Sequence, residues 1–208
     1  MKTLLLIPVL ALALTACGSG GDATPPAVTV SGTPPPAPAA SYSTNFNLTE
    51  NPISAGRWIN GKAVGLDWND VQSVPGKAYA SALATGYDDD IAVLNTTFAA
   101  NQYAQGTVYR VSGYSPGVSH EIELLLRFQV TAHNARGYEV LWGQTGEVNI
   151  VRWNGPLGDY TPLGAVSGPN IGAAVDGDVL RAEIIGSVIK VYKNGSLVMT
   201  GPSKFDVG

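Results

Sequence analysis

The chain has 208 residues, of which 13% are charged, and its formal net charge is −4 at pH 7. Lysine and arginine together number 12, which argues against nucleic-acid binding, because that function needs basic residues gathered on one face. Cys17 is the single cysteine, so the folded domain can contain neither a disulfide nor a thiolate metal site. The 25 glycines, with many valine, threonine and tyrosine residues, favour strands and tight turns.

The N-terminus has the features of an export signal. Met1 and Lys2 give a short positive start, and the apolar run Thr3–Leu14 is too short to span a bilayer. The following Leu14-Thr15-Ala16-Cys17 resembles the lipobox of bacterial lipoproteins. The resemblance implies a signal peptide at residues 1–16 and lipidation of Cys17. The alternative is an ordinary signal peptide or a small core cysteine.

The next segment predicts a tether and a location. Gly18 is not an acidic retention signal, so the resemblance to Gram-negative lipoproteins implies an extracytoplasmic protein at the outer membrane rather than the inner one. Acyl chains would provide the membrane contact without a transmembrane helix. Residues 17–40 hold repeated prolines among small residues. They predict an extended tether of about 60–70 Å, followed by one domain at residues 41–208.

The strongest strand signal lies at His120–Thr131. Its apolar residues alternate with polar ones and predict one buried face, made of Ile122, Leu124, Leu126, Phe128 and Val130. Leu125 is the exception to the alternation. A helix is a poor alternative, because residues at period two would wrap around its circumference.

A three-strand meander is predicted near the end of the chain, at Asp178–Ile185, Val188–Lys193 and Leu197–Thr200. Tight turns at Gly186-Ser187 and Asn194-Gly195 connect these strands. Further strands are expected at Thr107–Val111, Gly137–Trp142, Val148–Trp153, Ala78–Leu83 and Ile91–Leu94. Many short antiparallel strands indicate an all-β sandwich or barrel.

The hairpins of this meander resemble a known group of folds. Asp176-Gly177-Asp178-Val179-Leu180-Arg181-Ala182-Glu183, followed by Ile189-Lys190-Val191-Tyr192-Lys193-Asn194-Gly195, is similar to the hairpins of concanavalin A-like lectin/glucanase domains, which include laminin G-like modules. The resemblance implies a jelly-roll sandwich of two antiparallel sheets. In such folds a final strand returns beside the first. We therefore expect this sequence to lack its C-terminal strand, or to retain only Phe205–Gly208 of it.

The resemblance to glucanases raises the question of paired carboxylates. Glu121 and Glu123 point the same way from one strand, as the nucleophile of a retaining glycosidase and its neighbour would. The acid/base position falls on Leu125 or Leu126, neither of which can carry a proton. The pattern therefore favours a solvated strand face over a catalytic pair.

A serine hydrolase is also disfavoured. Gly113-Tyr114-Ser115-Pro116-Gly117 matches a nucleophile elbow, but Pro116 lacks the backbone N–H that the oxyanion hole needs. The histidines, His120 and His133, lie at opposite ends of the predicted strand, too far apart to share a metal or a triad. The sequence thus predicts no catalytic residue.

Acidic residues before the strand at Ile91–Leu94 form a weak candidate for a metal site. Asp88 and Asp90 lie on a loop and have the hard oxygen ligands that Ca²⁺ prefers. The alternative is a solvated turn, since no complete ligand set is readable. Apart from this Ca²⁺ the sequence predicts no cofactor.

An aromatic-rich loop is the main candidate for ligand binding. Flat aromatic faces and a few fixed polar groups are what a sugar site needs. The candidate residues are Trp142, Arg152, Trp153, Asn154, Asp159 and Tyr160. The alternative is that Trp153 packs in the core and that Asn154-Gly155 only turns the chain.

Three functions follow from these patterns. The leading hypothesis is a lipid-anchored surface module that binds a polysaccharide or glycan through the aromatic-rich loop. The first alternative is a glycoside hydrolase or polysaccharide lyase with an unrecognised site. The second is a structural or adhesion protein that binds another protein.

Overall fold

The computed structural model describes residues 40–54, 56–62, 65, 67–80, 89–109, 121–143, 145–166 and 171–203. All of them belong to one of the two units into which the chain divides, Pro38–Gly208. Cys17, the predicted signal peptide, the tether up to residue 39 and Phe205–Gly208 lie outside the described residues. No helix in the described part of the chain is long and apolar enough to cross a membrane.

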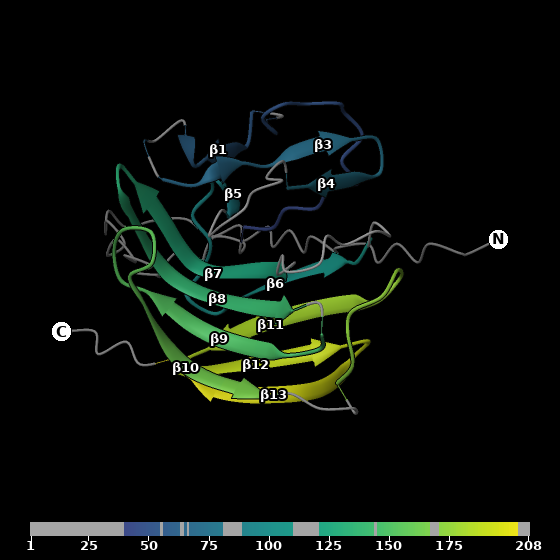
Figure 1. The fold of residues 1–208 in the computed structure, drawn as a ribbon, viewed down its shortest axis with the longest axis vertical. Coiled ribbons are helices and arrows are strands. Elements are labelled where there is room, and N and C mark those ends of the chain that lie inside the picture. The colour runs from purple at the N-terminus through teal and green to yellow at the C-terminus, as the bar shows by residue number, and fades with distance from the viewer. Residues whose placement is uncertain are drawn as a thin grey trace, which may run out of the picture. The chain divides into compact units, whose positions relative to one another are not determined.

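Strands dominate the described residues. One four-stranded antiparallel sheet has the order β10-β9-β8-β7, with β7 at Glu121–Thr131, β8 at Asn134–Gly143, β9 at Val148–Trp153 and β10 at Tyr160–Val166. A second has the order β13-β12-β11-β6, with β6 at Gln102–Thr107, β11 at Val179–Ile185, β12 at Val188–Lys193 and β13 at Ser196–Pro202. Figure 1 shows these sheets as two facing layers.

A smaller group of strands precedes the two large sheets. A three-stranded sheet has the order β1-β5-β2, and a separate hairpin pairs β3 with β4. The strands are β1 (Trp58–Asn60), β2 (Asn69–Asp70), β3 (Gln72–Val74), β4 (Lys77–Tyr79) and β5 (Asp90–Leu94). The pairing of β2 with β5 is parallel.

The main core lies between the two four-stranded sheets. One sheet contributes Leu126, Tyr138, Val140, Trp142, Val148 and Ile150, and the other Leu180, Ala182, Ile184, Ile189, Val191 and Met199. The layers lie so close at Gly201 that a side chain there would not fit, because its Cβ would lie 2.7 Å from Cδ1 of Ile150. Two antiparallel sheets with one shared apolar core make a β-sandwich. The prediction of an all-β sandwich is confirmed.

Most of the predicted strands occur where the alternation placed them. Val188–Lys193 and Val148–Trp153 have the predicted bounds, and the meander is present as β11, β12 and β13. The strand predicted at Thr107–Val111 is wrong in its described part, because the strand observed there, β6, ends at Thr107; residues 110 and 111 lie outside the described residues. Chain pairing explains the difference, since the six residues of β6 pair in register with β11.

A β-bulge changes the predicted face of β7. The register shifts between Leu126 and Gln129, and Arg127 has a φ of 48°. Leu126 therefore faces the main core, whereas Phe128 and Val130 face the opposite side of the sheet. The prediction that these three residues share one face is wrong, because a bulge inserts one residue and reverses the alternation.

That opposite side carries a second apolar cluster. Trp68 and Ile91, from the segment of β2 and β5, pack with Val151 and Trp153 of β9. Leu125 belongs to the same cluster, so its departure from the alternation reflects a second buried face. The sheet β10-β9-β8-β7 is thus covered on both sides, whereas sheet β13-β12-β11-β6 packs its inner side on the main core.

Candidate functional site

The two tryptophans of the predicted binding loop lie in the interior. Trp142 is 2% exposed within the main core, and Trp153 is 3% exposed within the second apolar cluster. They lie on opposite faces of their sheet. Trp142 faces the other four-stranded sheet, whereas Trp153 packs edge to face on Trp68, with 4.6 Å between the ring centres. This placement agrees with the packing interpretation of Trp153 and leaves neither ring open to a ligand.

The polar residues of that loop are brought together, but they bind one another. Arg152 Nε donates a hydrogen bond to Asn154 Oδ1 at 2.9 Å. The Asn154 amide nitrogen in turn donates to Asp159 at 3.3 Å and to Thr161 at 3.1 Å. Tyr160 is 42% exposed, and its ring lies 5.3 Å from that of Trp153. The loop therefore offers one exposed aromatic ring beside polar groups that already have partners.

The predicted calcium residues are only partly described. Asp88 lies outside the described residues, and Asp90 begins β5 beside Asn69 of β2. Across the described ranges, no group of three or more histidine, cysteine or acidic residues is placed to hold a metal ion. Calcium binding stays a prediction.

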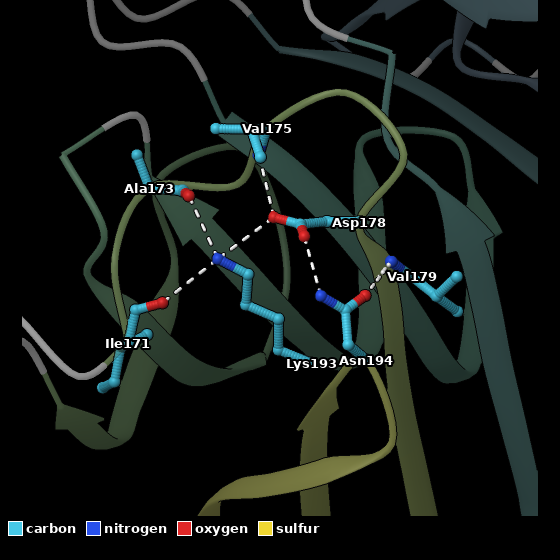
Figure 2. Close-up of polar contacts among 7 residues, drawn as sticks. All are labelled: Ile171, Ala173, Val175, Asp178, Val179, Lys193 and Asn194. Atoms are coloured by element: carbon cyan, nitrogen blue, oxygen red, sulfur yellow. Dashed lines mark hydrogen bonds and ion pairs between the residues drawn. The ribbon is translucent and has the colours of Figure 1, made fainter.

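A cluster of three oxygen atoms near the start of β11 surrounds the ammonium group of Lys193. Figure 2 shows Lys193 Nζ against a carboxylate oxygen of Asp178 at 3.0 Å and the carbonyl oxygens of Ile171 and Ala173 at 3.2 and 3.1 Å. Asn194 links the same carboxylate to the backbone of Val179. The Asp178 and Asn194 of the motif that resembles lectin-like hairpins thus fasten the segment before β11 to the β12–β13 turn.

Acidic residues gather on the side of β7 and β8 that bears the second apolar cluster. Glu139 of β8 is directly opposite Leu125 of β7, and Glu123 is two residues along the same face. Burial raises the pKa of Glu139 to about 7, although the hydrogen bond from the Trp153 indole lowers it. Burial and the nearby Glu139 also raise the pKa of Glu123 well above its usual value.

This arrangement does not supply the missing glycosidase acid. Glu139 puts a carboxyl next to Leu125, which occupies the acid/base position of the glucanase pattern in this chain, but Glu139 is only 5% exposed. One of its oxygens accepts the Trp153 Nε1–H at 2.6 Å. A general acid must reach the leaving group of its substrate, and Glu139 faces the protein interior instead.

The middle of the outward side of sheet β13-β12-β11-β6 is polar and aromatic, and the exposed apolar residues Ile185, Val188 and Leu197 lie near the strand ends. Along β11 and β12 the buried Leu180, Ala182, Ile184, Ile189 and Val191 alternate with residues that point away from the core. We call the outward set the polar face. It consists of Tyr103 and Gln105 of β6, Arg181 and Glu183 of β11, and Lys190 and Tyr192 of β12.

Hydrogen bonds and an ion pair join three of these side chains, and a cation–π contact adds a fourth, so that they form a row across three strands. The Tyr192 hydroxyl donates to Glu183 Oε1 at 2.8 Å, and Arg181 binds Glu183 Oε2 at 3.1 Å. The Arg181 guanidinium also lies 3.9 Å from the centre of the Tyr103 ring. Tyr103 itself is 61% exposed. The row ends in an aromatic ring that is open to solvent.

The electrostatics agree with this geometry. The hydrogen bond from Tyr192 lowers the pKa of Glu183, and Arg181 and Lys190 lower it further. The same hydrogen bond raises the pKa of the Tyr192 hydroxyl. Glu183 is therefore ionised and Tyr192 is protonated at neutral pH.

A shallow hollow lies in the polar face. Its volume is about 270 Å³, and it is lined by Gln105, Val179, Arg181, Glu183, Tyr192 and Gly195. Enclosed sites for small ligands run from about 300 to 1,000 Å³. An open hollow at or below the lower end of this range suits a ligand that lies across the surface.

The polar face was only partly predictable from the sequence. The alternation in β11 and β12 was readable and places Arg181, Glu183, Lys190 and Tyr192 outward. Strand β6 was not predicted, because Gln102–Thr107 contains few apolar residues. Without β6, nothing in the sequence places Tyr103 beside Arg181.

Comparisons with known proteins add little to this description. No protein-family model matches the sequence, and no curated protein matches it. Among solved structures, the carbohydrate binding module CBM66 from Bacillus subtilis is similar, with a TM-score of 0.46 and 15% sequence identity over 70% of this chain and 78% of that one. A likeness of this size assigns no ligand to the present chain.

Proposed function

We propose that this chain is a lipid-anchored extracytoplasmic binding module that holds a glycan on its polar face. One observation carries the proposal. The exposed Tyr103 ring lies beside the row of Arg181, Glu183 and Tyr192, whose polar groups are held in place by one another next to an open hollow.

The chemistry of this row suits a sugar. A pyranose presents an apolar face, which an aromatic ring covers, and hydroxyls, which need fixed donors and acceptors. Arg181 offers donors and Glu183 offers acceptor oxygens, and both are already oriented by their mutual contact. A preorganised site loses less side-chain entropy when the ligand binds.

The rival surface on the predicted loop is less suited to the same task. Trp153 is buried there, and Asn154 already binds Arg152, Asp159 and Thr161. The polar groups of both surfaces already bind one another, so the difference lies in the open hollow, which is lined by residues of the polar face and by none of the loop. Tyr160 remains as a single exposed ring.

Two tyrosine variants decide between the surfaces. Binding to dextran, cellulose and polygalacturonate is measured by affinity electrophoresis for the wild type, Tyr103→Ala and Tyr160→Ala. We expect Tyr103→Ala to weaken binding about tenfold, the effect of losing roughly 1.4 kcal/mol of stacking. Tyr160→Ala should stay within about twofold of the wild type. The reverse pattern would move the site to the loop, and no binding to any of these polymers by the wild type would count against a glycan-binding function.

The anchoring part of the proposal is supported by the sequence Leu14-Thr15-Ala16-Cys17 and the proline-rich segment after it. Mass spectrometry of the mature protein should find an N-terminal Cys17 that carries acyl chains. Cys17→Ser should release the domain from the outer-membrane fraction, because one or more acyl chains are then missing. A mature protein that begins at another residue and carries no lipid would contradict this part.

A further inference from the structure

A second aromatic ring with a cation over it lies beyond the end of β6. Tyr109 is 59% exposed, and Lys77 Nζ of β4 lies 3.9 Å from the centre of its ring. This pair repeats the arrangement of Tyr103 and Arg181, in which the guanidinium is also 3.9 Å from the ring centre. Neither Tyr109 nor Lys77 belongs to the polar face or lines its hollow.

The backbone places Tyr109 on the same side as Tyr103. Pairing of the chain with the segment before β11 continues past β6, because Val108 N donates to Asp178 O at 2.8 Å and Gly177 N donates to Val108 O at 3.0 Å. Val108 is buried in the main core. Side chains of an extended chain alternate between its two sides, so Tyr109 points outward, as Tyr103 does. Six residues of extended chain separate the two rings by roughly 20 Å.

The charges near these rings are positive on balance. Among the described residues of β6, β11, β12 and β13, Glu183 is the single acid, and it is already bound to Arg181. The exposed Asp176 precedes Gly177, whose N–H binds the Val108 carbonyl next to Tyr109. Lys190 shares the polar face, and Lys77 stands at Tyr109. The whole chain has a net charge of −4, so this local excess of cations differs in sign from the rest of the protein.

From this arrangement we propose that the ligand is an acidic polysaccharide that lies along β6 and occupies two subsites, one at Tyr103 and Arg181 and one at Tyr109 and Lys77. The inference rests on the proposed glycan-binding function and names its substrate class. In each subsite the aromatic ring covers the apolar face of a sugar, and the adjacent cation binds a carboxylate or sulfate group. Two linked subsites favour a long chain over a short one through effective concentration.

The test uses polymers that differ in charge and length. Dextran and dextran sulfate share a backbone and differ in sulfate, and polygalacturonate supplies a carboxylate polymer. Digalacturonate is too short to reach from Tyr103 to Tyr109. Dissociation constants for all four are measured with the mature protein by isothermal titration calorimetry. We expect at least one acidic polymer to bind more tightly than dextran, and polygalacturonate to bind at least tenfold more tightly than digalacturonate.

Three variants locate the second subsite. Lys77→Gln should weaken binding of the acidic polymer about fivefold and leave dextran binding unchanged. Tyr109→Ala should weaken it about tenfold and remove most of the advantage of the long chain. Lys62→Gln removes the same charge from an exposed position near β1 and should have no effect. Circular dichroism and thermal unfolding confirm that each variant is folded.

The outcomes separate this inference from the function on which it rests. If Tyr103→Ala abolishes binding while Lys77→Gln and Tyr109→Ala leave it unchanged, the polar face binds glycans and the second subsite is refuted. If dextran binds as tightly as dextran sulfate and polygalacturonate, the acidic substrate class is refuted. If none of the polymers binds the wild type, the glycan-binding function itself fails. A preference for sulfate or for carboxylate identifies the acidic group.

Discussion

The buried carboxyl of Glu139 makes the stability of this domain dependent on pH. Glu139→Gln keeps an oxygen to accept the Trp153 indole N–H and removes the ionisable group. The pKa of Glu139 is raised from 4.5 to about 7, which corresponds to a difference of about 3 kcal/mol between ionising it in the folded and unfolded chain. Below pH 4.5 the carboxyl is protonated in both states and costs nothing.

Between these pH values the unfolded chain releases the proton and the folded chain keeps it, so the wild type loses stability as the pH rises towards 7. Above pH 7 the loss is complete and constant. The glutamine variant has no such loss. Its stability relative to the wild type should therefore rise by up to about 3 kcal/mol between pH 4.5 and pH 8.

Urea unfolding followed by tryptophan fluorescence at pH 4.5, 6 and 8 measures this difference. Any fixed packing cost of the substitution cancels, because the comparison is between pH values. Glu147→Gln is the matched control, since the Thr145 hydroxyl lowers the pKa of Glu147 and ionisation therefore favours the folded state. That variant should gain no stability at pH 8. A Glu139→Gln variant whose advantage does not change with pH would refute the reasoning.

Three further substitutions and one control test the fold. Ile150→Ala in the main core should lower the free energy of unfolding by about 2–5 kcal/mol in urea, and a loss below 1 kcal/mol would contradict its place there. Gly137→Ala should lower it by about 1–3 kcal/mol, since its φ is 149° and a Cβ would lie 2.7 Å from backbone of the facing strand. Gly106→Ala, which meets nothing within 4 Å, should change the melting temperature little. Lys193→Met removes the counter-ion of the buried Asp178 carboxylate and should cost about 3 kcal/mol, with faster amide exchange at Asp178. Unchanged exchange would show that the lysine does not fasten this segment.

The meander was predictable because its local signals agree. Val188–Lys193 alternates along its length and lies between two tight turns that contain glycine, and each turn fixes the register of the strands it joins. The structure shows these bounds unchanged as β12. Local pattern and global pairing point to the same arrangement here, so the sequence alone was enough.

The face of β7 was not predictable in full. A bulge at Arg127 needs a partner strand that can accommodate it, and here that partner offers Gly137, where a Cβ would lie 2.7 Å from Phe128 Cα. The two positions are far enough apart in sequence that neither signals the other. The second buried face depends in addition on Trp68 and Ile91, which come from a distant segment.

The candidate site failed to appear in the sequence for a related reason. Arg152 and Trp153 are neighbours in the sequence and were predicted to share one binding loop, but they alternate along β9, and the side of Trp153 is covered by the second apolar cluster. Conversely, Tyr103 lies in a segment with few apolar residues, and its pairing opposite Glu183 is a long-range contact. The loop was predicted to bind a ligand because it is rich in aromatic residues, but whether an aromatic ring is exposed depends on packing between strands that are distant in the sequence.

The claim that the polar face is the ligand surface is tested most directly by nuclear magnetic resonance. Isotope-labelled protein is titrated with oligosaccharides from dextran and from polygalacturonate, and the backbone amide shifts are followed. We expect the largest changes at Tyr103, Arg181 and Tyr192, with little change from Asn154 to Tyr160. Changes concentrated at Asn154–Tyr160, or no change with either sugar, would contradict the account.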